Sequence, residues 1–240
     1  MNQPINQASA EAGATTSAKP DMQMIAHHVW QVRNRFPANS INVYLIEDVL
    51  IDAATRWDAS ILLKQLEHIP LSQVALTHCH PDHQGAVKQI CTTRNIPLAC
   101  PEADVASMEG RAPMVPRTAA IQLEQLAIAG PAYPVQRILH DGDEIAGFRV
   151  IHMPGHTPGH VIYFRESDRL AIAGDVLRNG DFFGKPGLGE VPGVYTVDRE
   201  ENRRSIRKLA QLRPALVCFG HGPVLYDMEQ LDRFVAQLPS

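Results

Sequence analysis

Short apolar runs rich in Val and Ile alternate along the chain with longer stretches in which apolar residues recur at helical spacing. Short runs between turn residues are typical of buried strands, and the longer periodic stretches are typical of amphipathic helices. The runs predict strands over residues 29–33, 42–46, 49–52, 74–77, 97–100, 135–139, 148–152, 161–164, 170–173 and 216–219. The periodic stretches predict helices over residues 59–68, 86–94, 118–127, 199–212 and 228–237, with Asp198 as N-cap of the fourth.

Strands and helices mixed in this order predict sheets covered by helices, so the expected fold class is α/β or α+β. No internal repeat is legible and no linker divides the chain, which predicts one domain over residues 23–240. Residues 1–22 are rich in polar and small residues and carry no apolar run. This segment is predicted to be a disordered or extended N-terminal tail.

The composition is that of an ordinary globular protein, with 45% hydrophobic and 20% charged residues. A formal net charge of −4 leaves no excess of Lys and Arg, so nucleic acid is not expected as a partner. No stretch is apolar and long enough for a secretory signal or a membrane span. The cysteines are scattered without CxxC spacing and are expected to be reduced. We therefore expect a cytoplasmic protein that is not membrane-bound.

The densest chemistry in the chain is the pattern His78-x-His80-x-Asp82-His83, between a predicted strand and a predicted helix. Two histidines two positions apart on an extended backbone point the same way, and the next two side chains follow where the chain turns. Such a cluster carries a cost in solvation and repulsion unless metal or solvent satisfies it. Imidazole and carboxylate without thiolate suit zinc, iron or manganese. The pattern therefore predicts a metal site.

Three later segments share one design, an apolar strand that ends in a glycine turn and displays one metal-capable residue. These residues are His156, Asp175 and His221, each directly after a glycine. Glycine allows close approach of the backbone to a site, and strand ends are favoured positions for catalytic groups in layered folds. Each segment is a weak signal alone. Together with the first cluster, they supply ligands for two complete metal sites.

These residues resemble the HxHxDH motif and the later ligands of the metallo-β-lactamase superfamily, from about Val29 to Leu225. The resemblance implies a four-layer αββα sandwich with the metals at one edge of its two sheets. It assigns His78, His80 and His156 to one metal, and Asp82, His83 and His221 to the other, with Asp175 as the bridge. It also implies that Asp52 orients a ligand histidine from behind, with a helix or turn cap as the alternative role.

The implied chemistry depends on two metal ions per chain, expected to be zinc, with iron or manganese as alternatives. Two cations about 3.5–4 Å apart share one hydroxide, whose parent water has its pKa lowered to roughly 7. That hydroxide attacks a carbonyl centre, while Asp175 reduces the repulsion between the ions. Asp82 is also assigned a catalytic role, the transfer of a proton to the leaving group. His160 is interpreted as a structural histidine, and Cys79 is given no catalytic role.

Two long irregular stretches are predicted to select the substrate. Arg178, Phe182, Phe183 and Tyr195, together with Lys185 and Leu188, are expected to wall a pocket beside the metals. Met108, Met114 and Val115 are expected to cover it from the other side. The alternative interpretation places some of these residues in a homodimer contact. Arg178 stands where many homoserine-lactone lactonases carry a tyrosine, which weakens that activity as a candidate.

The leading functional hypothesis is hydrolysis of an ester, lactone or thioester bond in a small-molecule substrate. An exported β-lactamase is disfavoured because the chain shows no signal sequence. A glyoxalase II is disfavoured because the chain has no room for that family's C-terminal helical domain. One alternative is a mononuclear iron oxygenase of the persulfide dioxygenase type. Another is a non-catalytic binding protein on the same scaffold.

Overall fold

The computed structural model describes residues 22–180 and 187–239 of the chain. Its larger sheet has seven strands, in the same order in space as in sequence. Strands β1 to β4 are antiparallel neighbours, and β4 to β7 are parallel neighbours. The strands are β1 (Met22–Ala26), β2 (Val29–Val32), β3 (Val43–Ile46), β4 (Val49–Ile51), β5 (Gln73–Ala75), β6 (Leu98–Pro101) and β7 (Arg137–Leu139).

The second sheet has five strands in the order β14-β11-β10-β9-β8. Strands β14 and β11 are parallel, and the other neighbours are antiparallel. Its strands are β8 (Glu144–Ile145), β9 (Phe148–His152), β10 (Val161–Arg165), β11 (Leu170–Ile172) and β14 (Leu216–Cys218). A separate two-stranded ribbon joins β12 (Arg178–Asn179) and β13 (Leu188–Gly189).

The two sheets pack face to face because their central strands are apolar on both sides. In β3, Tyr44 faces the core shared by the two sheets, whereas Leu45 faces the helices outside. In β10, Tyr163 faces the shared core, and Phe164 faces the opposite helical layer. Successive side chains of a strand point to opposite faces, so continuous apolar runs give strands that are buried twice.

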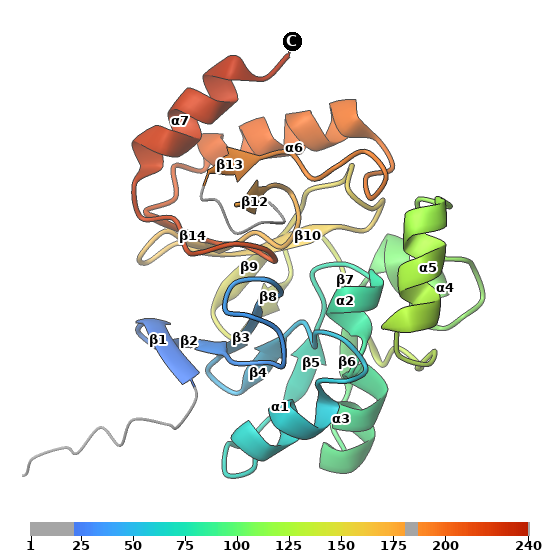
Figure 1. Cartoon of the computed structure of the whole chain (residues 1–240). Coiled ribbons are helices and arrows are strands. Elements are labelled where there is room, and N and C mark those ends of the chain that lie inside the picture. The colour runs from blue at the N-terminus through green and yellow to red at the C-terminus, as the bar shows by residue number, and fades with distance from the viewer. Residues whose placement is uncertain (1–21, 181–186, 240) are drawn as a thin grey trace, which may run out of the picture.

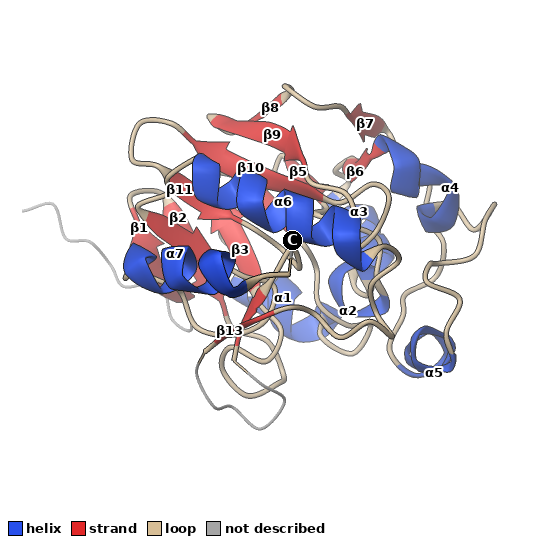
Figure 2. Ribbon diagram, turned by 90° about the horizontal axis from the view of Figure 1, so that it is seen from above, coloured by secondary structure: helices blue, strands red, loops and turns tan. Residues whose placement is uncertain are grey.

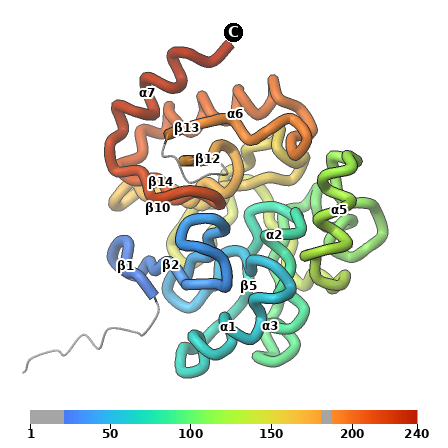
Figure 3. Tube along the Cα trace, in the orientation of Figure 1, coloured from blue at the N-terminus to red at the C-terminus, as the bar shows by residue number. Residues whose placement is uncertain are grey.

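Helices cover the outer face of each sheet (Figure 1). Helices α1 (Ala59–Gln65) and α3 (Val87–Arg94) lie over the larger sheet. Helices α6 (Arg199–Gln211) and α7 (Met228–Gln237) lie across the second sheet, as the view from above shows (Figure 2). The N-terminal part of the chain forms the larger sheet with α1 and α3, and the C-terminal part forms the second sheet with α6 and α7 (Figure 3). The predicted αββα sandwich is confirmed.

The remaining helices are short and lie near the edge of the sandwich. They are α2 (Pro81–Gln84), the 3-10 turn η1 (Glu102–Asp104), α4 (Val105–Met108) and α5 (Ala119–Ala127). The predicted N-cap of α6 is confirmed, since the Asp198 carboxylate accepts a hydrogen bond from Glu201 N at 2.9 Å. No helix among the residues described is both long and apolar enough to cross a bilayer.

The sequence prediction differs from the structure at the N-terminus. Met22, assigned to the tail, is the first residue of β1, which pairs with β2 at the edge of the larger sheet. The other residues of the predicted tail, 1–21, lie outside the described residues. Strand β1 was not predicted. It is an edge strand that pairs only with β2, and its side chains are partly exposed. Edge strands lack the strong apolar pattern of central ones.

Candidate metal centre

The predicted metal-capable residues follow the ends of strands from both sheets. His78 and His80 follow β5, His156 lies in the loop after β9, Asp175 follows β11, and His221 follows β14. All these strands end at the same edge of the sandwich. The structure therefore brings together side chains that the sequence separates, and it places them in overlapping groups of three.

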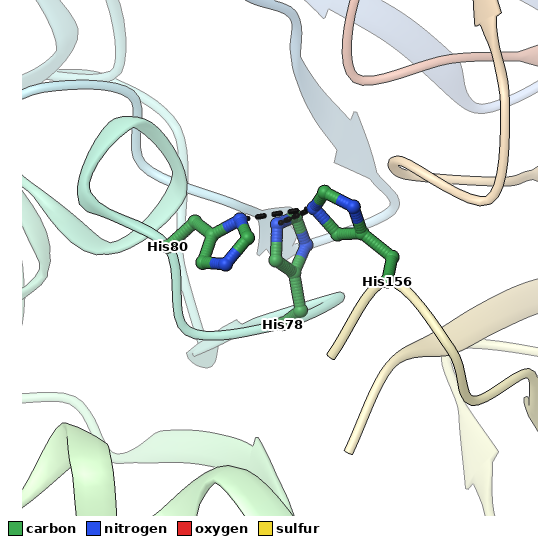
Figure 4. Close-up of side chains that lie close together, drawn as sticks. All are labelled: His78, His80 and His156. Atoms are coloured by element: carbon green, nitrogen blue, oxygen red, sulfur yellow. Dashed lines mark hydrogen bonds between the residues drawn. The ribbon is translucent and has the colours of Figure 1, made fainter. Parts of the chain in front are cut away.

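The first group consists of His78, His80 and His156, all buried. The Nε2 atom of His156 lies 3.2 Å from His78 Nε2 and 2.9 Å from His80 Nδ1 (Figure 4). Burial, reinforced by the neighbouring imidazoles, lowers the pKa of His78 and of His156 well below the usual range. Burial also lowers the pKa of His80. All three rings are therefore in the neutral form that binds metal ions.

Hydrogen bonds on the far side of each ring fix which nitrogen faces the group. Nε2–H of His80 donates to the Val115 carbonyl at 2.7 Å, which leaves Nδ1 as an acceptor. The Thr77 hydroxyl donates to Asp52, so it accepts from Nδ1–H of His78 at 3.0 Å. The Thr196 hydroxyl donates to the Val191 carbonyl, so it accepts from Nδ1–H of His156 at 3.4 Å. Three ring nitrogens then face one another with lone pairs and no proton between them. A cation at their centre would turn this repulsion into coordination.

The second group consists of Asp82, His83 and His221. Helix α2 carries the first two, and Nε2 of His221 lies 3.2 Å from Asp82 Oδ2. Nδ1–H of His221 donates to the Ser40 carbonyl at 2.5 Å, so its Nε2 faces the group. In the same way, Nδ1–H of His83 donates to Asp52 Oδ2 at 2.9 Å.

Charge distinguishes the second group from the first. Burial alone would lower the pKa of His83 and His221, but nearby carboxylates raise it well above the usual value. Burial likewise opposes ionisation of Asp82 and Asp175, yet the two histidines hold the pKa of each carboxyl below its usual value. Without metal, protons on these histidines thus supply the positive charge that a cation would bring.

Asp175 lies between the two groups. Its Oδ2 is 3.2 Å from His221 Nε2 and 3.7 Å from His156 Nε2, and its Oδ1 is 3.5 Å from His83 Nε2. Asp175 therefore lies within 4 Å of members of both groups, and its bridging role stays a prediction. A Cβ atom on Gly220 would stand 2.0 Å from Asp175 Oδ1, so only glycine fits there.

Two buried atoms of the site have no hydrogen-bond partner. They are Nε2 of His83 and Oδ1 of Asp175. Buried polar atoms are almost always satisfied, because an unsatisfied one costs about 1–3 kcal/mol. A metal ion bound by both atoms would satisfy them, and imidazole with carboxylate is a suitable ligand set for zinc or iron. The residues present therefore fit a pair of metal ions that share Asp175.

Asp52 lies directly behind this centre and is buried. Besides His83, its carboxylate accepts from Thr77 N at 2.8 Å and from the Thr77 hydroxyl at 2.8 Å. Asp52 therefore contacts one predicted ligand directly and reaches His78 through the Thr77 hydroxyl. Both are contacts of the kind that orients a metal ligand from behind.

His160 was interpreted from the sequence as a structural histidine, and Cys79 was given no catalytic role. Nε2 of His160 accepts from Asp175 N at 3.0 Å, and burial lowers the pKa of His160 to about 3. His160 thus holds the backbone of the bridging residue and belongs to none of the three-residue groups. The Cys79 thiol lies 3.8 Å from Met108 Sδ in the core, away from the metal-capable atoms.

A pocket of about 420 Å³ opens onto the centre. Its wall includes Arg178 and Tyr195, as predicted, together with Asn39, Val191 and Asn179. The Arg178 guanidinium donates to the carbonyls of Gly180 and Glu190 at the pocket wall.

Other predictions about the pocket were wrong or lie outside the described residues. Met108 and Met114 do not cover it, because both are buried in the core beneath the larger sheet. Leu188 packs toward the α6 and α7 layer instead. Phe182 and Phe183, with Lys185, lie outside the described residues.

The sequence interpretation missed Glu124 of α5, which lines this pocket. The Tyr195 hydroxyl forms a hydrogen bond with the Glu124 carboxylate. Burial, with the negative charge of Asp82 nearby, raises the pKa of Glu124 to about 7. Burial and the Glu124 charge raise the pKa of Tyr195 to about 12. The pattern of α5 gave no signal of this, because its Leu123 and Leu126 are exposed while Glu124 faces the pocket.

Comparison with known proteins places this geometry in a family. The family model described as "Metallo-beta-lactamase superfamily" matches residues 37–221, more than half of the chain. The chain is 29% identical over 211 residues to "Probable metallo-hydrolase YflN" of Bacillus subtilis, covering 75% of this chain and 80% of that protein. It is 30% identical over 171 residues to "Hydroxyacylglutathione hydrolase" of Cereibacter sphaeroides, covering 68% of this chain and 54% of that protein.

Solved structures agree with the sequence comparison. The structure described as "Crystal structure of TTHA1623 in a di-iron-bound form" matches with a TM-score of 0.61 and 29% identity. The match covers 81% of this chain and 94% of that one. The family match, the αββα layers and the histidine and aspartate cluster at their edge all lead to one conclusion. The chain belongs to the metallo-β-lactamase superfamily.

Proposed function

We propose that the chain is a hydrolase that holds two metal ions and cleaves an ester, lactone or thioester bond in a small molecule. One observation carries the proposal. Two groups of ligands meet at Asp175, where His83 Nε2 and Asp175 Oδ1 are buried without a hydrogen-bond partner and lie 3.5 Å from each other. When bound, such a pair of ions supplies Lewis acidity and an activated water for attack on a carbonyl carbon.

The residues around the centre orient the metal ligands and transfer protons. Backbone carbonyls behind His80 and His221, and the Thr77 hydroxyl behind His78, hold these rings in one orientation, so little reorganisation is needed when ligands bind. The Asp82 carboxylate is buried less completely than that of Asp175, and it lines the pocket. From there it can accept the proton that the attacking water releases and pass it to the leaving group, which is the catalytic role we propose for it.

The pocket supports a small-molecule substrate. Its volume of about 420 Å³ lies within the range of ligand sites in proteins, roughly 300–1,000 Å³. The likeness to a hydroxyacylglutathione hydrolase supports the thioester member of the proposed substrate class. The chain matches only 54% of that relative's length, so we extend the reaction type to this chain and leave glutathione out of the proposal.

Zinc is the metal we propose for both positions, and iron is the principal alternative. The ligand set of histidine and aspartate accepts either ion. The similar structure in a di-iron-bound form gives iron particular weight. A mononuclear iron oxygenase would need only one group, whereas this chain retains the second group of Asp82, His83 and His221 in full.

The test is metal quantification of the full-length protein, followed by a panel of esters, lactones and thioesters on the same sample. We expect two equivalents of metal and hydrolysis of at least one substrate class. About one iron per chain with oxygen uptake on glutathione persulfide would support the oxygenase instead. Two bound ions without turnover of any substrate would support a binding protein.

The variant Asp82→Ala sharpens this test. It removes one ligand and the proposed proton donor, so it should lose one metal equivalent and most of the hydrolysis while circular dichroism stays unchanged. The matched control is Asp232→Ala, an exposed aspartate on α7 that should change neither quantity. Wild-type turnover in Asp82→Ala would refute the role given to Asp82.

A further inference from the structure

Asp104 is a buried carboxylate to which sequence analysis assigned no role. It is the last residue of η1, and it precedes α4 without capping that helix by its side chain. The side chain points away from both helical turns, toward the metal-capable loops. A role in ending or starting a helix therefore does not explain why a carboxylate is buried here.

The Asp104 carboxylate joins two loops that carry the first metal group. Its Oδ2 accepts from Cys79 N at 2.9 Å and from the Thr157 hydroxyl at 2.9 Å. Its Oδ1 accepts from Gly159 N at 3.0 Å. Cys79 lies between His78 and His80, and Thr157 follows His156 directly. One side chain thus contacts the immediate neighbours of all three histidines of that group.

Close packing fixes the distance between the loops. A Cβ atom on Gly159 would lie 2.6 Å from both Cγ and Oδ1 of Asp104, so the loop approaches the carboxylate as closely as a backbone can. Farther along the same segments, Val161 N donates to Thr77 O at 2.9 Å. The two loops come from different sheets, and Asp104 holds them together at the end nearest the histidines.

Charge gives a second reason for a carboxylate at this position. Within residues 22–180 and 187–239, no lysine or arginine forms an ion pair with Asp104. A buried charge without a counter-ion is costly unless hydrogen bonds or a nearby cation compensate it. Three donors supply part of this compensation, and a cation in the adjacent histidine group would supply more.

We propose that Asp104 is a positioning residue. By holding the two loops that carry His78, His80 and His156, it sets the affinity of this first group for a metal ion. The role rests on the proposed function insofar as it requires that group to bind a metal ion. Asp104 has no hydrogen bond to Asp82, His83 or His221, so its influence should be selective for the first group.

The principal variant is Asp104→Asn. An amide has the shape of the carboxylate, but its NH2 group must face either Gly159 N or the pair of donors on the other side. At least one loop therefore loses its hydrogen bond. Removing a group that orients metal ligands typically weakens metal binding about 10–100-fold. We expect the affinity for the first ion to fall by about 10–100-fold and the affinity for the second ion to fall by less than about threefold.

The chain offers a matched control in Asp58. This aspartate is also buried, and its carboxylate also accepts three hydrogen bonds, from Arg35 N at 2.7 Å, Thr55 N at 3.1 Å and the Thr55 hydroxyl at 2.5 Å. None of its partners belongs to a loop of the first metal group. Asp58→Asn should therefore lower the unfolding temperature of the metal-free protein without selective loss of the first ion.

The measurement is competition for Zn²⁺ between the full-length protein and a chromophoric chelator. Each variant is also prepared in the His221→Ala background, where only the first group is complete. There the dissociation constant of Zn²⁺ should rise at least tenfold in Asp104→Asn and less than threefold in Asp58→Asn. Equal changes in the two variants, or none in Asp104→Asn, would overturn the proposal.

A milder pair of variants covers the case in which Asp104→Asn does not fold. Thr157→Val removes one donor to Asp104 and keeps the shape, whereas Thr157→Ser keeps the hydroxyl. We expect weaker Zn²⁺ binding in the first and near wild-type binding in the second, and identical binding in both would overturn the proposal. A wild-type protein that takes up no ion would overturn the proposed function as well, which distinguishes that failure from a failure of Asp104 alone.

Discussion

Replacing Asp52 with asparagine perturbs the metal centre from behind without removing any ligand. The carboxylate accepts from Thr77 N on Oδ1, and from the Thr77 hydroxyl and His83 Nδ1 on Oδ2. With its NH2 group on the Oδ2 side, the amide would face two donors. In the neutral form that binds metal, His83 would then carry its remaining proton on Nε2, the atom that faces the metal-capable group.

The size of the effect follows from that tautomer. An Nε2 that carries a proton cannot coordinate a metal ion. The second ion therefore loses His83 as a ligand while the asparagine NH2 group faces His83 Nδ1. Loss of a partner of this kind typically weakens metal binding about 10–100-fold. This corresponds to about 1.4–2.8 kcal/mol of binding free energy. The opposite amide orientation spares His83 but leaves Thr77 N unsatisfied, at a cost of about 1–3 kcal/mol in stability.

The assay is the Zn²⁺ competition titration in the His80→Ala background, where the second group alone is complete. Asp52→Asn should raise the dissociation constant of that ion by about 10–100-fold. The control is Thr77→Val, which removes the hydroxyl that contacts His78 and leaves the contact between Asp52 and His83 in place. Thr77→Val should leave the affinity for the second ion unchanged in this background, and it should weaken binding of the first ion in the His221→Ala background.

One result would refute this reasoning directly. If Asp52→Asn binds both ions as tightly as the wild-type protein and unfolds at the same temperature, the carboxylate neither sets the tautomer of His83 nor satisfies Thr77. Asp52 would then be a turn residue without influence on the centre.

Two further predictions concern the pH dependence of stability, measured by urea unfolding of the metal-free protein between pH 4 and 8. The pKa of His160 is about 3, below its usual value, so the unfolded chain binds this proton first and stability should be lost as the pH falls from about 6.5 toward 3. His160→Gln keeps an acceptor for Asp175 N and should flatten that slope, and an unchanged slope would contradict the assignment. The pKa of Glu124 is about 7, above its usual value, so its contribution to stability should be lost as the pH rises from about 4.5 to 7. Glu124→Gln should remove this loss, with Asp232→Ala as the control, and a persistent loss would place its origin elsewhere.

The sequence predicted those parts of the fold that depend on local patterns. Strands β3 and β10 are buried on both faces. Their sequences are therefore continuous apolar runs, and such runs indicated central strands. Asp198 was recognisable as an N-cap, because capping depends only on residues a few positions away. The metal-capable set was recognisable because four of its members lie within six positions and each of the other three directly follows a glycine.

The parts that the sequence did not predict depend on contacts between distant segments. Asp104 meets residues 25 and 55 positions away, and in the sequence it looks like an acidic residue at a helix start. His221 is held by a backbone carbonyl 181 positions away, which no side-chain pattern can indicate. Glu124 and Tyr195 meet where the start of α5 contacts the loop before α6, since the Thr118 hydroxyl donates to the Val194 carbonyl 76 positions away. Topology determines these contacts, and local propensity does not.

The metal centre is built from features that do not favour a stable metal-free protein. Three neutral imidazoles face one another with lone pairs, and two buried atoms, His83 Nε2 and Asp175 Oδ1, lack partners. Each unsatisfied atom costs about 1–3 kcal/mol, whereas an ion at one hundred times its dissociation constant stabilises the folded state by about 2.7 kcal/mol. Metal binding can therefore offset the cost of the site. The joint presence of these residues at one sheet edge, in a chain of the metallo-β-lactamase superfamily, supports a metal-dependent function.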